Sequence, residues 1–296
     1  MPWKRRGFRV RSGGKKIMPL TWNVAYYSGM SSTQDLRAAV DEGVPVGVVA
    51  TLLDTLKLLR TLPRHLDAGG AVFIDSGAFS AFQKGELVSW EKVYFAYECV
   101  LGRTDYPGAL SIVAPDVIGD QSATLDLWAV HAERVRTWIT AGARVIIPLQ
   151  CGELSAGEML AHAKRIFQTD QFCAGIPSNL AAMTAEDCAT LHHHDFHLLG
   201  RVVINAELGD KLRALLANNP DAIYTADANW LRSRIKQISL AAKDLRQAPP
   251  DNPFESSRTR AVRAMLRQDA YHQKNYPLRQ ERQNGSKIES LPLLSL

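Results

Sequence analysis

The sequence predicts an α/β fold and, within that class, a (β/α)8 TIM barrel formed by a single domain. The chain has 296 residues, which suits a barrel of about 250 residues with extensions. Apolar runs of strand length alternate along it with stretches of helical periodicity, and short polar turns separate them. No glycine-rich phosphate loop follows the first strand, which argues against a dinucleotide-binding sheet.

The first half of the chain supplies four predicted strands. Gly29 ends the first, and Ser31-Ser32-Thr33 can cap the helix that follows. The second is a continuous apolar run, typical of a strand buried on both faces, and the third runs into a polar turn at Asp75. These strands are residues 22–29, 45–51, 71–74 and 110–116, and the helices between them are the stretch through Asp41, 52–62 and 89–101.

The second half repeats the alternation. A long amphipathic helix ends where Gly142 can act as its C-terminal cap, and each later strand is again a short apolar run. The strands are residues 144–150, 171–177, 196–203 and 222–227. The helices are residues 121–141, 155–167, 184–192, 206–218 and 230–245.

The barrel is expected to occupy residues 21–247, between a basic N-terminal arm (1–20) and an irregular, partly disordered C-terminal extension (248–296) with a short helix around 257–268. Residues 1–16 carry seven Lys or Arg and no acid, whereas residues 17–240 carry 18 basic and 24 acidic residues, a net charge of −6. An acidic body with basic ends suits an enzyme that holds a polyanion through its extensions, and equally suits tails that only aid solubility.

The sequence shows no signal for membrane insertion, export or a metal centre. It has no apolar run of about 18 residues, and its first residues lack the apolar core of a signal peptide. The four cysteines are scattered without a CxxC pair, and His192-His193-His194 has no spaced partner ligand. We therefore expect a soluble, cytoplasmic protein with no membrane partner, no bound metal and no cofactor.

Polar residues gather at the predicted carboxyl ends of the strands, where active sites of parallel α/β proteins lie. Carboxylates that converge there repel one another, so at least one pKa should rise, as in sites that pair an acid with a nucleophile. Each residue also has a structural alternative: Asp75 with Ser76, and Asp227, can cap helices, and Asp116 can be a turn residue. The set is Asp75, Ser76, Asp116 with Asp120 nearby, Gln150, Ser178, Asn179, Asp227 and Asn229.

Four segments in this order resemble the tRNA-guanine transglycosylase superfamily, between about residues 70 and 235. IDSGAFS resembles the family's DSGGFQ turn, LQCG its VQGG segment and AGIP its glycine-containing base loop, and HLLG is present outright. Members of this superfamily are (β/α)8 barrels that exchange guanine for a 7-deazaguanine.

The resemblance implies a role for each matched residue. Asp75 would be the general acid and base, and Asp227 the nucleophile that attacks C1′ of the sugar. The substrate-binding residues would be Ser76, Phe79, Asp116, Gln150, Gly152 and Gly175. Among these, Phe79 would stack on the base, and Asp116, Gln150 and Gly175 would recognise the edge of a flipped-out purine.

The departures from the family pattern favour DNA as the acceptor. Ala78 and Ser80 replace the family's Gly and Gln in the SGAFS turn, the chain is short, and no cysteine after Cys188 provides the CxCxxC zinc segment of the tRNA enzymes. These features look more like the branch of phages and bacterial DNA-modification islands, which inserts 7-deazaguanines such as preQ0 into DNA. That branch implies work in a bacterial or phage-infected cytosol, with possible partner proteins of the modification system.

Nucleic acid is therefore the expected macromolecular partner, with tRNA as the alternative to DNA, and a 7-deazaguanine base the small one. The basic arm, with Trp3 and Phe8 among its charges, would hold the phosphate backbone. Its candidate contacts are Lys4, Arg5, Arg6, Arg9 and Arg11. Two other hypotheses remain: a catalytically silent barrel that binds nucleic acid, and an unrelated barrel hydrolase that uses paired acids.

Overall fold

The computed structural model describes residues 25–29, 32–178, 182–200, 206–228, 253 and 255–273. The predicted helix over 230–245, the basic arm and the first residues of the first predicted strand lie outside these described residues. So do Asn179 and Asn229 among the polar residues expected at the strand ends.

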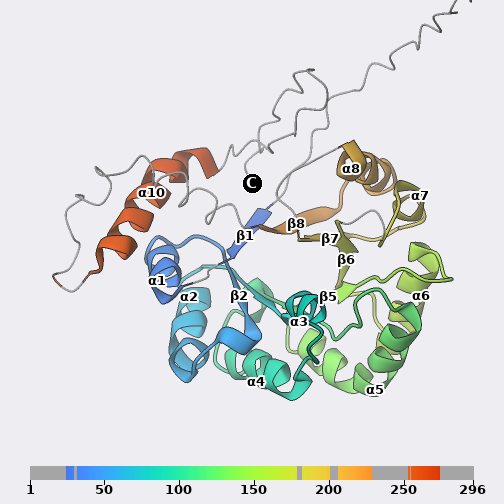
Figure 1. Cartoon of the computed structure of the whole chain (residues 1–296), viewed down its shortest axis with the longest axis horizontal. Coiled ribbons are helices and arrows are strands. Elements are labelled where there is room, and N and C mark those ends of the chain that lie inside the picture. Colours follow the sequence, from blue (N-terminus) through green and yellow to red (C-terminus); the bar gives the residue numbers. More distant parts are fainter. Residues whose placement is uncertain are drawn as a thin grey trace, which may run out of the picture.

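The centre of the molecule is a parallel sheet, around which the helices are arranged (Figure 1). Its strands are hydrogen-bonded in chain order, and the last pairs with the first, with Ala25 opposite Thr225 and Tyr27 opposite Asp227. The strands are β1 (Ala25–Gly29), β2 (Val46–Val49), β3 (Val72–Asp75), β4 (Leu110–Val113), β5 (Arg144–Pro148), β6 (Cys173–Pro177), β7 (Asp195–Leu199) and β8 (Ile223–Ala228). The α/β class and the parallel sheet are confirmed.

Long apolar-periodic segments form the helices that the sequence predicts. Side chains cap several of them: Ser32 caps α1, Asp120 caps α5, and Ser155 forms a capping box with Glu158 on α6. The predicted bounds of the helices near residues 89–101, 121–141, 155–167 and 206–218 agree with the structure to within one residue. The α-helices are α1 (Thr33–Asp41), α2 (Leu62–Asp67), α3 (Ala78–Lys84), α4 (Trp90–Leu101), α5 (Gln121–Thr140), α6 (Ala156–Phe167), α7 (Ala185–Cys188), α8 (Ala206–Asn218) and α10 (Ser257–Gln273).

The helix predicted over 52–62 is wrong in its bounds. A 3₁₀ turn, η1 (Ala50–Leu52), comes first; a π-helical turn, η2 (Lys57–Thr61), then leads into α2. Asp54 caps the helical segment that begins after it, because its carboxylate accepts a hydrogen bond from the Lys57 N–H at 2.9 Å. The wide turn ends just before Pro63, whose ring crowds the preceding turn and which has no N–H to donate.

The helix predicted over 184–192 is much shorter in the structure, where α7 ends at Cys188. Asn219 is the reason: its side chain accepts from the His193 N–H at 2.9 Å and donates to the Leu191 carbonyl at 3.0 Å. These bonds replace the helical pattern. The histidines therefore lie on a loop and not at a helix end.

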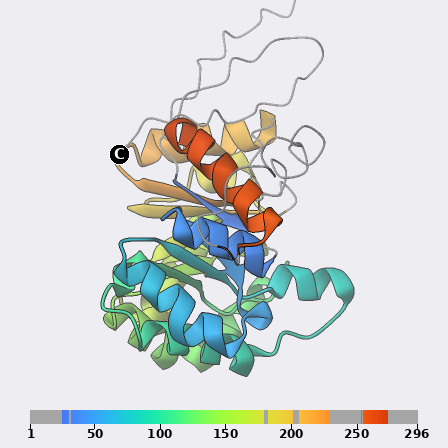
Figure 2. The same cartoon turned by 90° about the vertical axis from the view of Figure 1, so that its left-hand side faces the viewer.

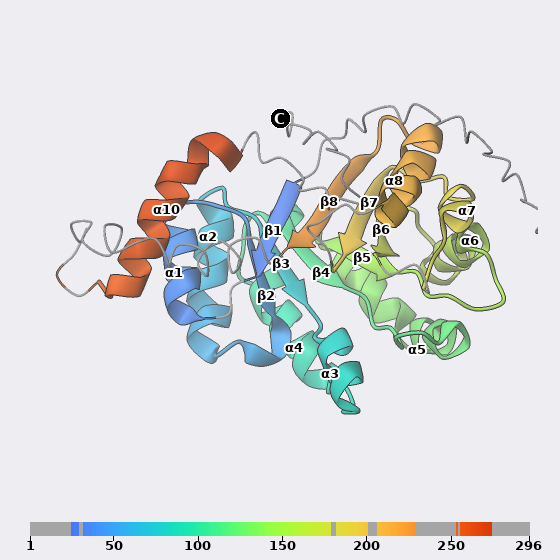
Figure 3. The same ribbon diagram turned by 45° about the horizontal axis from the view of Figure 1, so that its top comes forward.

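Helix α3 was not predicted, because the SGAF segment was interpreted only as a turn. The turn does exist, with Gly77 in the left-handed region at φ +81°, but Ala78 then begins a two-turn helix. Only Ala78 of this helix is buried, so α3 lacks the apolar periodicity by which buried helices are recognised. It stands out from the ring of helices (Figures 2 and 3).

Alternate residues of the strands serve two different cores. Val72 and Ile74 pack outward with the helices in the main hydrophobic core, whereas Phe73 faces inward with a small cluster of Val113, Ile146 and Cys173. Inward-facing positions therefore line the space enclosed by the sheet. Asp75, two residues after Phe73, is on this inward side at the carboxyl end of β3.

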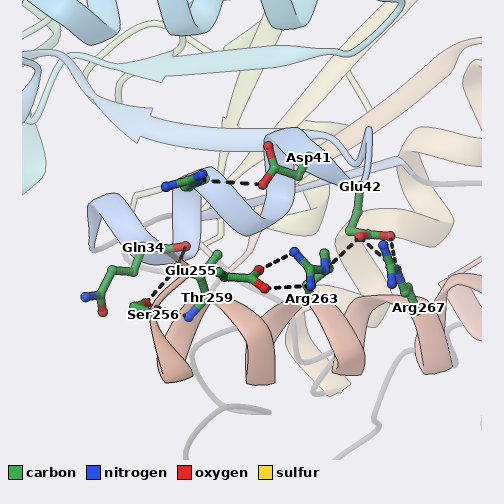
Figure 4. Close-up of polar contacts among 9 residues, drawn as sticks. Gln34, Asp41, Glu42, Glu255, Ser256, Thr259, Arg263 and Arg267 are labelled. Carbon is green, nitrogen blue, oxygen red and sulfur yellow. Dashed lines mark hydrogen bonds and ion pairs between the residues drawn. The ribbon is translucent and has the colours of Figure 1, made fainter. Parts of the chain in front are cut away.

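The predicted helix of the C-terminal extension is present and longer than expected, as α10, which packs along α1 (Figure 2). Ion pairs join the two helices: Arg258 to Asp35 at 2.7 Å and Arg267 to Glu42 at 2.9 Å. Buried Arg263 binds Glu255 and lies 3.6 Å from Glu42 (Figure 4). Within the described residues, no helix is both long and apolar enough to cross a membrane.

Candidate active site

The turn after β3 holds Asp75 at the mouth of the enclosed space. The Asp75 carboxylate accepts from the Gly77 N–H at 3.1 Å, and the Ser76 hydroxyl accepts from the Ala78 N–H at 3.2 Å. A side chain at Gly77 would meet Val49 at 3.0 Å, and its positive φ also favours glycine. Both bonds span two residues and hold the turn before α3, whose N-cap is Gly77 and which has no side-chain cap, so Asp75 remains at the strand end without capping the helix.

Asp116 and Gln150 form a buried pair on the neighbouring loops after β4 and β5. Gln150 Nε2 donates to Asp116 Oδ2 at 2.8 Å, and Gln150 Oε1 accepts from the Gly119 N–H at 3.0 Å, which fixes the orientation of the amide. Trp128 Nε1 holds the Asp116 loop by donating to the Pro115 carbonyl at 2.9 Å. The pair therefore presents a carboxylate and an amide in a defined geometry.

Gln121, on the first turn of α5, ties the Gln150 loop in place. Its Nε2 donates to the carbonyls of Gln150 and Leu154, both at 3.0 Å, and its Oε1 accepts from the Leu154 N–H at 2.8 Å. A Cβ at Gly152 would come within 2.5 Å of the Gln121 side chain. The structure therefore gives Gly152 a packing role: it leaves room for the glutamine that supports Gln150.

Asp227 enters the same end of the sheet from β8. The Gly200 N–H, at the end of β7, donates to its Oδ1, and His197 Nε2 lies 3.8 Å from the same oxygen. Gly200 has φ +88°, a conformation that favours glycine and directs its N–H to the carboxylate. The Asp227 side chain is largely buried, with 29% of its surface exposed, whereas His197 beside it is fully buried.

The three aspartates interact electrostatically. Burial raises the pKa of Asp116 to about 7, and the charge of Asp75 adds to that rise. Burial also raises the pKa of Asp227 to about 7, against the Gly200 hydrogen bond that lowers it and with a further rise from Asp75. The pKa of Asp75 is itself raised by burial. Among the described residues, no Lys or Arg forms an ion pair with any of the three.

Tyr97, on α4, lies behind this group. Its ring is fully buried, and the pKa of its hydroxyl is raised well above the usual value, first by burial and then by the charge of Asp75, with a smaller contribution from Asp116. The charges of both carboxylates thus raise the pKa of the same phenol. Because Asp75 also raises the pKa of Asp227, the three acids belong to one electrostatic group.

The other predicted site residues have different positions. Phe79 is 56% exposed on the first turn of α3, and Gly175 is buried in β6, where a Cβ would lie 3.0 Å from Ile146 and 3.1 Å from Pro148 Cα. The structure thus brings Asp75, Asp116, Gln150 and Asp227 together at one end of the sheet, whereas Phe79 points to solvent. The basic-arm residues from Lys4 to Arg11 lie outside the described residues.

Two residues next to Asp227 were missed as site residues, although their segment was noted. His197 and Gly200 are the first and last residues of the HLLG segment, and both face the Asp227 carboxylate. The signal was the segment itself: a histidine and a glycine three residues apart at a strand end. Tyr97 gave no such signal, because an aromatic residue on an apolar helix face reads as core.

The described residues contain no group of three or more His, Cys, Asp or Glu side chains arranged to hold a metal ion. His193, from the histidine run, is buried and binds the Phe172 carbonyl through Nε2 at 2.7 Å. Burial lowers its pKa, so the ring is a neutral packing element. His192 and His194 are exposed.

No protein-family model matches the chain, and no curated protein matches it. Solved structures with some similarity include a putative fructose-1,6-biphosphate aldolase from Coccidioides immitis, 11% identical over 83% of this chain and 90% of that one, with a TM-score of 0.46. The YdjI aldolase from Escherichia coli K12 is 12% identical over 84% of this chain and 90% of its own, with a TM-score of 0.44.

A putative sugar phosphate isomerase/epimerase from Anabaena variabilis is 11% identical over 85% of this chain and 100% of its own, with a TM-score of 0.43. Similarity at this level assigns no function. The site is therefore interpreted from its own residues.

Proposed function

We propose that this chain is an enzyme, a base-exchange transglycosylase that replaces guanine in nucleic acid with a 7-deazaguanine such as preQ0. The observation that carries the proposal is the electrostatic coupling of Asp75 to both Asp116 and Asp227, acids that come from separate parts of the chain. The finer fold assignment, a complete (β/α)8 barrel in one domain, is part of the proposal. Chain-order pairing and the contact of β8 with β1 support it.

The chemistry needs one ionised and one protonated carboxyl group. In the proposed reaction, Asp227 Oδ attacks C1′, the bond from C1′ to N9 of guanine breaks, and Asp75 gives its proton to the leaving base. The incoming base then loses its N9 proton to Asp75 and attacks C1′, which releases the Asp227 carboxylate. Burial raises the pKa of Asp75, which is the direction that a general acid requires.

The pair of Asp116 and Gln150 supports recognition of a purine edge. Guanine presents N–H donors beside a carbonyl acceptor, and the pair offers a carboxylate acceptor beside an amide held in one orientation by Gly119. Exposed Phe79 is positioned outside the buried group, where a base or a neighbouring nucleotide can stack. A flipped-out base reaches such a site without the rest of the duplex.

DNA is the favoured acceptor, with tRNA as the alternative, because the chain lacks the CxCxxC zinc segment expected of tRNA enzymes. The basic arm, with Lys4 and Arg5 among its charges, would bind the phosphate backbone in either case. Partner proteins of a DNA-modification system and a cytoplasmic location belong to the same proposal.

The test is incorporation of isotope-labelled preQ0 into DNA and into tRNA, measured by mass spectrometry of the released nucleosides. We expect exchange into DNA, and a loss of at least about a thousand-fold in Asp227→Asn because the nucleophile is removed. Asp120→Asn is the matched control, since Asp120 is an exposed cap of α5 outside the site and asparagine caps equally well.

Each other outcome has a meaning. Exchange into tRNA alone would favour the tRNA alternative, and release of guanine without any replacement base would favour the paired-acid hydrolase. Absence of exchange and of release with both acceptors would contradict the proposal and favour a silent nucleic-acid-binding barrel.

A further inference from the structure

A chain of polar contacts runs beneath Asp227 through the space enclosed by the sheet. Arg144, the first residue of β5, binds Asp195 of β7 through two hydrogen bonds of 2.7 and 2.6 Å. Its Nη2 also donates to Thr225 Oγ1 of β8 at 2.8 Å. Thr225 Oγ1 lies 2.8 Å from His197 Nδ1, and His197 Nε2 lies 3.8 Å from Asp227 Oδ1.

This arrangement assigns the tautomer of His197. A guanidinium can only donate, so Thr225 Oγ1 is an acceptor for Arg144 and its own hydrogen is left to donate elsewhere. His197 Nδ1 is at 2.8 Å, whereas the alternative acceptor, the Phe196 carbonyl, is at 3.4 Å. We assign the hydroxyl hydrogen to the shorter of the two contacts, so that Nδ1 accepts and Nε2 carries the proton.

The imidazole is also fixed in orientation and in charge. Its ring stacks on Phe73 of β3, with centroids 4.9 Å apart and an interplanar angle of 27°. The ring is fully buried, and burial together with the charge of Arg144 lowers its pKa well below the usual value. A neutral ring therefore places Nε2 3.8 Å from Asp227 Oδ1, in electrostatic range but beyond the length of a hydrogen bond.

We propose that His197 is a positioning residue for Asp227: its Nε2–H, oriented by Thr225 and Arg144, stabilises the ionised carboxylate that the reaction needs. The catalytic part of this inference rests on the proposed function. The other groups that act on Asp227 among the described residues are the N–H groups of Gly200 and of Asp227 itself, which act in the same direction, and Asp75 of β3, whose charge acts against it.

The variants separate the dipole from the packing. His197→Phe keeps a ring of similar size and removes the N–H, whereas His197→Gln places an amide N–H near the position of Nε2. Thr225→Val removes the hydroxyl that fixes the tautomer, and Thr225→Ser keeps it. The readout is the pKa of Asp227, measured by ¹³C NMR of labelled aspartate carboxyl groups and assigned with Asp227→Asn.

We expect His197→Phe to raise the pKa of Asp227 by about one unit, a tenfold loss of the ionised form near neutral pH. Thr225→Val should raise it by a smaller amount, and His197→Gln and Thr225→Ser should leave it near the wild-type value. An unchanged pKa in both His197→Phe and Thr225→Val, with the native NMR spectrum retained, would overturn the proposal.

The kinetic counterpart is the pH profile of kcat/KM for base exchange. In His197→Phe the limb that rises with ionisation of Asp227 should move to higher pH by the same amount, with activity recovering toward the wild-type level at high pH. A purely structural effect would lower the rate equally at all pH values. If the wild-type protein catalyses no exchange, the proposed function fails, while the NMR titration still decides the role of His197.

Discussion

The two ends of the space enclosed by the sheet handle charge in opposite ways. At the amino end, the Arg144 guanidinium is paired with Asp195 and bonded to Ser111 and Thr225. At the carboxyl end, Asp75, Asp116 and Asp227 meet without any Lys or Arg in ion-pair contact among the described residues. The groups next to these carboxylates are backbone N–H groups, a glutamine side chain and a neutral histidine ring.

The difference indicates where the structure is built for stability and where for chemistry. The hydrogen-bonded pair of Arg144 and Asp195 joins β5 to β7 across β6, and a carboxylate beside a guanidinium has no tendency to take up a proton. Buried carboxylates without a cation are destabilising, and such groups gather at functional sites because raised pKa values let them transfer protons. The charged groups at both ends are largely buried, and the two ends differ in whether a counter-charge is present.

Removal of the amino-end cation should have the largest effect on stability. We expect Arg144→Met to lower the free energy of unfolding by about 3–5 kcal/mol, because it leaves the Asp195 carboxylate buried and unpaired. The measurement is urea-induced unfolding monitored by circular dichroism. The double variant Arg144→Met/Asp195→Leu should recover most of the loss, and a double variant as unstable as the single one would contradict this account of the pair.

Removal of one carboxyl-end charge should act in the opposite sense. Asp116→Asn and Asp227→Asn should each raise the free energy of unfolding at pH 8 by about 1–2 kcal/mol, because asparagine needs no counter-charge and keeps an acceptor for Gln150 or Gly200. Asp120→Asn, on an exposed helix cap, should change it by less than about 0.5 kcal/mol.

The dependence of stability on pH follows from the direction of these pKa shifts. Asp116 and Asp227 have pKa values of about 7 in the folded state against 3.8 for an ordinary aspartate, so the folded state holds protons that the unfolded state has released between about pH 4 and pH 7. Their contribution to stability therefore falls as pH rises through that range, and the advantage of the asparagine variants should grow from pH 4 to pH 7.

Buried His65 and His193, whose pKa values are lowered, act oppositely below about pH 6.5, but they are far from both substitutions in the sequence and are common to wild type and variants, so they cancel in the difference. An advantage for the asparagine variants that is equal at pH 4 and pH 8 would contradict the assigned pKa values.

The strands and the longer helices could be predicted from the sequence, because they depend on the local pattern of apolar and polar residues. Continuous apolar runs such as the one before Asp75 predicted the strands and placed the acids at their carboxyl ends, since a buried parallel strand must be apolar and its terminus is the first position open to polar groups. The electrostatic influence of Asp75 on Asp227 followed from the fold class, because parallel strands place their carboxyl ends at the same edge of a sheet.

The parts that could not be predicted depend on contacts between distant residues. Asn219 shortens α7, and Glu42 and Asp35 hold α10, through side chains that no local pattern connects. The role of His197 arises from Thr225 and Arg144, on two other strands, and from the register that stacks them. The local pattern of apolar and polar residues does not predict these contacts. Arg144 and Thr225, for example, each look like ordinary strand residues in the sequence.

The central claim is that Asp75 and Asp227 share one site, and the pKa of Asp227 in Asp75→Asn tests it most directly. ¹³C NMR titration of labelled aspartate carboxyl groups should show that pKa falling below its wild-type value of about 7, because the like charge that raises it has been removed. An Asp227 titration unchanged by Asp75→Asn, in a protein that remains folded, would contradict the claim and with it the proposed base exchange.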